Sequence, residues 1–141
     1  MELALVLLIA ALLVSTLRPA YINAMNEFKS KGVIEKLEEI AQLIEEYYKD
    51  NGVYPDNLDE VITPVPNDPW GNPYEYLRIN GGSGGMGQLR KDKNLVPINS
   101  DFDLYSKGPD GASTSPLTAQ ISRDDIVRGR NGGFYGVATD Y

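Results

Sequence analysis

The residues best suited to chemistry are three aspartates in the last third of the chain. Asp110 and the adjacent Asp124 and Asp125 flank a stretch rich in serine, threonine and alanine. Oxygen donors on a flexible loop suit Ca²⁺, which takes about 6–8 oxygen ligands and tolerates irregular geometry. The spacing is not that of an EF-hand, because the required glycine and terminal glutamate are missing. On spacing alone, solvated turn aspartates, with Asp124 capping a helix, are the favoured alternative.

The sequence offers little else for catalysis. It contains no histidine and no cysteine, so it lacks the commonest general base and any thiol nucleophile. Zinc fingers and serine-histidine triads are thereby excluded. Asp124 and Asp125 could act as a carboxylate pair, but the side chains of adjacent residues rarely converge on one bond. We therefore expect the protein not to be an enzyme.

Length and charge narrow the classes of protein to which the chain could belong. The chain has 141 residues and a formal net charge of -7, which fits a single domain with an acidic surface. Such a surface repels phosphate backbones, so we expect no nucleic-acid partner. Because no disulfide can form, an exported domain of this size needs another clasp.

A hydrophobic run near the N-terminus predicts a membrane segment. Residues 3–17 are apolar except for Ser15 and Thr16, and Arg18 is the first charged residue after Glu2. The run is somewhat shorter than the roughly 20 residues that span a bilayer. A signal peptide is the alternative. It is disfavoured because no lysine or arginine precedes the run and no small-x-small cleavage site follows it.

Glu2 stands at the head of this apolar segment. An acid in lipid is costly unless it is paired, so acids within membrane helices are usually functional. The positive end of the helix dipole favours a carboxylate at this position. A simple location in the headgroup region is the alternative, and it is favoured when Glu2 is considered alone.

Periodicity beyond the apolar run predicts that the helix continues. The positions spaced four and three residues apart are Val33, Leu37, Ile40, Ile44 and Tyr47. Such spacing gives one apolar stripe, so we expect one helix over residues 3–50, hydrophobic at first and amphipathic later. Pro19 and Gly32 interrupt it. Proline removes a helical hydrogen bond, so a kink or melted stretch is expected over residues 18–24, and two separate helices are the alternative.

The rest of the chain predicts a small sheet. Residues 74–79, 102–106 and 134–137 have strand character, and residues 58–62 could form a short helix. Residues 80–87 contain five glycines and form a flexible loop. The predicted fold class is α+β, a long helix packed on a three-stranded antiparallel sheet with long loops. We expect residues 1–24 to form the hydrophobic segment and residues 25–141 to form a globular domain that includes the amphipathic half of the helix.

These features together resemble the major pseudopilins of type II secretion systems, within the type IV pilin superfamily. The matching parts, in chain order, are the apolar helix with Glu2 and Pro19, residues 47–55 (Tyr-Tyr-Lys-Asp-Asn-Gly-Val-Tyr-Pro), 67–74 (Asn-Asp-Pro-Trp-Gly-Asn-Pro-Tyr), 103–111 (Asp-Leu-Tyr-Ser-Lys-Gly-Pro-Asp-Gly) and 124–126 (Asp-Asp-Ile). They run in order along nearly the whole chain. The Asp-Pro-Trp-Gly and Gly-Pro-Asp-Gly motifs together are specific to the family.

The resemblance implies a structural polymer. Such subunits are cleaved and N-methylated by a prepilin peptidase, held in the inner membrane, and extruded by an assembly platform into a periplasmic or extracellular filament that includes minor pseudopilins. The resemblance makes Glu2 and Pro19 assembly residues, with Glu2 neutralising the N-terminal amine of a neighbouring subunit. It also makes Asp110, Asp124 and Asp125 ligands of a structural Ca²⁺, with loop carbonyl groups completing the shell.

The chain departs from the family pattern in three places. Glu2 and Pro19 keep the family's separation, but both come three residues early. We infer a leader and three further mature residues ahead of Met1, and a subunit with a truncated head is the alternative. Residues 81–100 look like an insertion. The stretch between Gly111 and Asp124 is longer than usual, so the carbonyl ligands are left unassigned.

Two other functions stay open at the level of sequence. One is a pilin of a surface filament used for adhesion or motility, for which the loop at residues 81–87 is the only candidate for an exposed variable segment. The other is a membrane-tethered calcium-binding module that does not polymerise. That module predicts that Glu2 tolerates replacement by alanine or glutamine.

Overall fold

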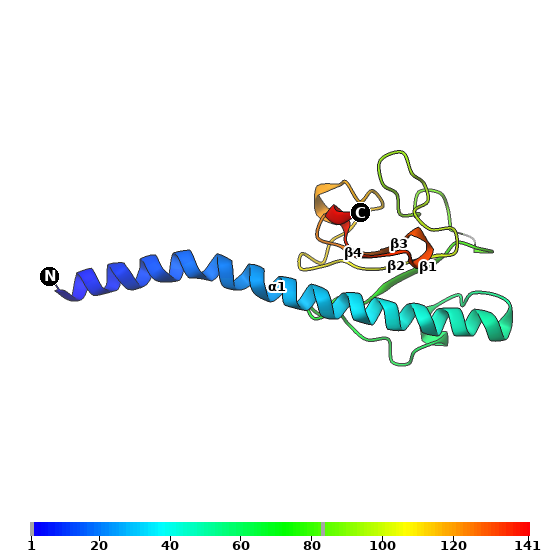
Figure 1. Ribbon diagram of the computed structural model, residues 1–141, viewed down its shortest axis with the longest axis horizontal. Coiled ribbons are helices and arrows are strands. Elements are labelled where there is room, and N and C mark those ends of the chain that lie inside the picture. Colours follow the sequence, from blue (N-terminus) through cyan, green and yellow to red (C-terminus); the bar gives the residue numbers. More distant parts are fainter. Residues whose placement is uncertain (1, 83) are drawn as a thin grey trace.

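The computed structural model describes residues 2–82 and 84–141 and consists of one long helix with a small sheet packed against its C-terminal half (Figure 1). The main elements are α1 (Glu2–Asn51), β1 (Glu75–Arg78), β2 (Phe102–Ser106), β3 (Ile126–Gly129) and β4 (Phe134–Val137). The predicted α+β class and its long helix on an antiparallel sheet are confirmed. Met1 of the predicted hydrophobic segment and Ser83 of the glycine-rich loop lie outside the described residues.

The sheet has four strands, so the predicted number of three was wrong. Its order is β1-β2-β3-β4, and each neighbouring pair is antiparallel. The strand that the sequence did not predict is β3, in which all four residues are buried. A short strand buried on both faces lacks the alternation of polar and apolar residues that identifies a half-exposed strand. The predicted short helix at residues 58–62 is a 3₁₀ turn, Leu58–Glu60.

Helix α1 continues through both of the residues expected to interrupt it. Pro19 and Gly32 lie inside the 50-residue helix, so the alternative of two separate helices was wrong. Residues 18–24 are helical throughout, and no melted stretch occurs there. The helix instead curves along its N-terminal part, as Figure 1 shows. A bend without a break is a common consequence of proline in a long helix.

The core lies between the C-terminal half of α1 and the sheet. The predicted stripe positions Val33, Leu37, Ile40 and Ile44 are fully buried. They pack in one cluster with sheet residues that include Phe102, Leu104 and Ile126. The last stripe residue, Tyr47, is only half-buried, and its hydroxyl donates a hydrogen bond to Glu60 at 2.6 Å. The stripe therefore fixes which face of the helix meets the sheet.

Candidate functional site

The most conspicuous feature is an arm, which we define as residues 2–25 of α1. Every residue of the arm is exposed, and Figure 1 shows it in blue, projecting away from the folded domain. Within the described residues, α1 is the one helix long and apolar enough to cross a membrane, and none of its most apolar stretch is buried. By length and composition the arm is suited to be a membrane anchor or a signal sequence.

Polar groups within the arm are arranged in a way that suits apolar surroundings. The hydroxyl groups of Ser15 and Thr16 donate to the carbonyl of Leu12 at 2.9 and 3.0 Å. Their hydrogen-bonding needs are therefore met inside the helix. Glu2 is the first residue of α1 and is exposed.

The Asp-Pro-Trp-Gly motif contacts α1 at the point where the arm joins the folded domain. The indole Nε1 of Trp70 donates to Oδ1 of Asn26 at 3.2 Å, and Asn26 is the first residue beyond the arm. Lys29 Nζ lies 5.8 Å from the centre of the Trp70 ring. The motif thus fixes the point at which the helix leaves the domain.

Asp68, the first residue of this motif, organises the loop through hydrogen bonds that need a carboxylate. Its buried side chain accepts hydrogen bonds from the backbone N–H groups of Trp70 at 3.0 Å and Asn72 at 2.9 Å. The hydroxyl of Ser106, at the end of β2, donates to it at 2.6 Å. An aspartate that binds the backbone two residues later is the usual Asx-turn. Asp68 therefore shapes the loop and joins it to the sheet.

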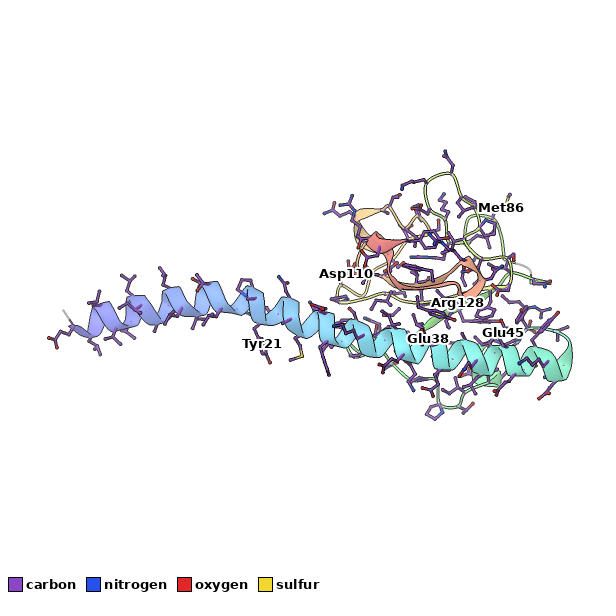
Figure 2. The ribbon with its side chains drawn as sticks, in the orientation of Figure 1. Tyr21, Glu38, Glu45, Met86, Asp110 and Arg128 are labelled. Atoms are coloured by element: carbon purple, nitrogen blue, oxygen red, sulfur yellow. The ribbon has the colours of Figure 1, made fainter. Side chains whose placement is uncertain are left out.

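The structure brings two of the three predicted calcium ligands together. The carboxylate Oδ2 of Asp124 accepts a hydrogen bond from the backbone N–H of Asp110 at 3.1 Å. Asp110 is exposed, and its own Oδ1 accepts from the N–H of Ala112 at 2.8 Å. Asp124 does not cap the preceding 3₁₀ turn, whose N-cap is Ala119. Figure 2 shows Asp110 at the edge of the domain.

Asp125 is engaged differently. It is fully buried and forms an ion pair with Nη2 of Arg90. The hydroxyl of Ser113 donates to the same carboxylate oxygen, Oδ2, at 2.6 Å. Burial raises the pKa of Asp125 to about 6, and the hydrogen bond from Ser113 and the positive charge of Arg90 oppose that rise. The remaining oxygen, Oδ1, is buried without a hydrogen-bond partner among the described residues.

The three aspartates do not converge as one set of metal ligands. Over residues 2–82 and 84–141, no group of three acidic, histidine or cysteine residues is placed to hold a metal ion. Asp110 and Asp124 are joined by a hydrogen bond, whereas the side chain of Asp125 is paired with Arg90. The arrangement therefore does not fit a site built from all three carboxylates, and calcium binding stays a prediction.

Sequence reasoning missed Arg90 and Ser113. Arg90 belongs to the segment interpreted as an insertion, and Ser113 lies in a stretch of small polar residues without a recognisable motif. Their meeting with Asp125 depends on contacts between distant loops, for which residue spacing gave no signal.

Comparison with family models, with curated proteins and with solved structures found no match to this chain. Two of the chain's sequence motifs have clear structural roles. The Asp-Pro-Trp-Gly loop holds the base of the arm, and the turn that contains Gly108 and Asp110 packs against Asp124.

Proposed function

We propose that the protein is a structural subunit that polymerises through its arm into a pilus-like filament, the pseudopilus of a type II secretion system. The observation that carries the proposal is the exposed apolar arm, continuous with a helix that is packed on its own domain. A contiguous apolar surface of this size requires either lipid or protein to cover it. Lipid of the inner membrane covers it before assembly, and the arms of other subunits cover it in the filament.

The change from lipid to protein contacts requires more than hydrophobicity. Lipid chains are as apolar as leucine side chains, so helices associate in a membrane through close packing and polar contacts. Glu2 supplies a charge for such a contact, because it is an exposed acid at the start of the apolar arm. Pairing of Glu2 with the N-terminal amine of a neighbour favours one axial register between subunits.

The absence of native cysteines allows a direct test of arm-to-arm contact. Single cysteines introduced at successive arm positions, for example Leu5→Cys, Leu8→Cys and Leu12→Cys, are oxidised in sheared surface filaments and in membranes. Because each subunit then carries one thiol and can form one disulfide, we expect cross-linked dimers from filament material, at positions that recur with the helical period. Folded monomer that stays in the membrane without cross-linking, with no filaments seen by electron microscopy, would identify a tethered module instead.

Replacement of Glu2 distinguishes a polymer from a tethered module. We expect Glu2→Ala to abolish filaments in electron micrographs while the folded monomer stays in the membrane, because the unpaired amine of a neighbour then lies in an apolar core. Glu46→Ala is the matched control, since Glu46 is an exposed acid of the same helix within the folded domain. Normal filaments from the Glu2→Ala variant would contradict the proposed role.

A further inference from the structure

A buried arginine pairs with one of the three aspartates that the resemblance makes ligands of calcium. Arg90 is only 2% exposed, and its position is fixed by backbone contacts on both sides. Its own N–H donates to Oδ2 of Asp103 on β2 at 2.9 Å. The next residue, Lys91, pairs with the Ser115–Leu117 segment through backbone hydrogen bonds of 3.0 and 2.8 Å. The chain around Arg90 is thus tied both to the sheet and to the loop that precedes Asp125.

The guanidinium group of Arg90 donates hydrogen bonds to oxygen atoms from two separate segments. Nη1 donates to the hydroxyl of Ser113 at 2.6 Å and to the carbonyl of Thr114 at 2.7 Å, and Nη2 pairs with the carboxylate of Asp125. The guanidinium carbon lies 4.2 Å from the centre of the Tyr105 ring, which covers one face of the group. These contacts join residues 90, 113–114 and 125 in one cluster, which we call the Arg90 clasp.

The chemistry of the clasp is that of a cation site. A carboxylate, a hydroxyl and a backbone carbonyl are the oxygen ligands that Ca²⁺ takes in proteins. Arginine offers five N–H donors and stays protonated at any physiological pH. We infer that Arg90 is a built-in cation that cross-links these loops in place of a divalent metal ion. Folding of the domain is then independent of calcium, whether or not the chain polymerises.

One oxygen of Asp125 has the features of a metal ligand, but the charge beside it disfavours a metal ion. Oδ1 of Asp125 is buried without a hydrogen-bond partner in the described part of the chain. However, the other oxygen of the same carboxylate is bound to the guanidinium of Arg90. A divalent cation at Oδ1 would stand beside a fixed positive charge in a poorly solvated site, where like charges repel strongly. The pairing of Oδ2 with Arg90 is therefore stronger evidence against a metal ion than the unpaired Oδ1 is evidence for one.

The wild-type protein provides the decisive measurement. The full chain in detergent micelles is heated in 2 mM CaCl₂ and in excess EGTA, with unfolding followed by circular dichroism, and Ca²⁺ binding is measured by calorimetry. We expect melting temperatures that agree within about 1 °C, since a ligand that binds only the native state would raise them, and no saturable binding below millimolar concentrations. Stoichiometric binding with a clear rise in melting temperature would overturn the inference.

Variants of Arg90 test the clasp itself. We expect Arg90→Gln to lower the melting temperature by roughly 10 °C or more, because it leaves Asp125 buried without its partner. Arg90→Lys keeps the charge but not the fork of donors, so an intermediate loss is expected. Arg123→Gln, a change at an exposed arginine of the adjacent loop, is the control and should have little effect. An Arg90→Gln variant as stable as the wild type would contradict the clasp, and a failure of that variant to fold would support it.

Discussion

Trp70 and Asn26, although 44 residues apart in sequence, are joined by a hydrogen bond of 3.2 Å between the indole Nε1 and the side-chain Oδ1. Asn26 stands at the boundary between the exposed arm and the packed half of α1. The contact therefore determines how rigidly the arm is held.

The first prediction concerns this junction. We expect Asn26→Ala to lower the free energy of unfolding by about 1 kcal/mol, the usual net contribution of one hydrogen bond. The emission of Trp70, the only tryptophan, should shift to longer wavelength as the indole becomes more accessible to water. Fluorescence of the full chain in detergent during urea unfolding measures both effects.

Asn23→Ala is the matched control for this prediction. Asn23 is an exposed residue of the same helix, and its replacement by alanine changes helix propensity by the same amount. The difference between the two variants therefore isolates the contact with Trp70. Equal stabilities and equal emission spectra would show that the bond does not fix the arm.

The second prediction compares two glycines. Gly108 has a φ of 64°, and a Cβ atom there would come within 2.1 Å of the carbonyl oxygen of Asp124. We expect Gly108→Ala to destabilise the domain by roughly 2–4 kcal/mol, because both the backbone conformation and the contact with Asp124 must change. The midpoint of urea unfolding, followed by Trp70 fluorescence, measures the loss.

Gly32→Ala should have the opposite effect. Gly32 lies within α1, and an added Cβ would meet no other heavy atom of the described residues within 4 Å. Alanine is favoured over glycine in a helix interior by about 1 kcal/mol. A gain at Gly32 together with a loss at Gly108 is expected, and a similar effect at both positions would contradict the explanation.

The sequence predicted the features that depend on local pattern. The stripe that begins at Val33 and the alternation over residues 74–79 were sufficient for the helix and for β1, because their periods are those of the elements themselves. Strand β3 was missed because burial on both faces removes its alternation. The partner of Asp125 was missed for another reason. Arg90 reaches Asp125 only because the segment around Lys91 pairs with residues 115–117, and such contacts between distant loops leave no periodic signal.

The third prediction concerns the ion pair between Arg128 and Asp101. Nη1 and Nη2 of the buried Arg128 donate to the two oxygens of Asp101 at 2.9 and 2.6 Å, and the guanidinium covers the ring of Phe102 at 3.9 Å. Figure 2 shows Arg128 between the sheet and α1, near Glu45, whose carboxylate is 3.8 Å away. We expect Asp101→Asn to cost about 3 kcal/mol in unfolding free energy, because it leaves a buried charge without its main partner.

The pair between Lys107 and Glu75 provides the comparison. Its atoms are 2.6 Å apart, but both side chains are about one-third exposed. Solvent weakens such pairs, so Glu75→Gln should cost less than about 1 kcal/mol. Chemical denaturation of both variants under the same conditions tests the contrast. A larger loss for Glu75→Gln than for Asp101→Asn would show that burial does not determine the strength of these pairs.

The fourth prediction concerns alkaline pH. Burial raises the pKa of Tyr74 from 10.0 to about 12, and the side chain packs in the main core cluster. The folded state therefore holds this proton more tightly than the unfolded state. The resulting stabilisation is fully present below pH 10, and it is lost as the pH rises towards and through 12. At pH 11.5 the loss attributable to Tyr74 should be about 2 kcal/mol.

Tyr74→Phe removes this proton without removing the aromatic ring. The variant should match the wild type near pH 8 and retain about 2 kcal/mol more of its unfolding free energy at pH 11.5. Tyr21→Phe, in the exposed arm, removes a phenol that makes no contact with the core and is the control. Urea unfolding at the two pH values measures all three proteins. If Tyr74→Phe lost as much stability as the wild type at high pH, the alkaline sensitivity would have to arise from half-buried tyrosines, such as Tyr105 or Tyr135, whose pKa values desolvation also raises.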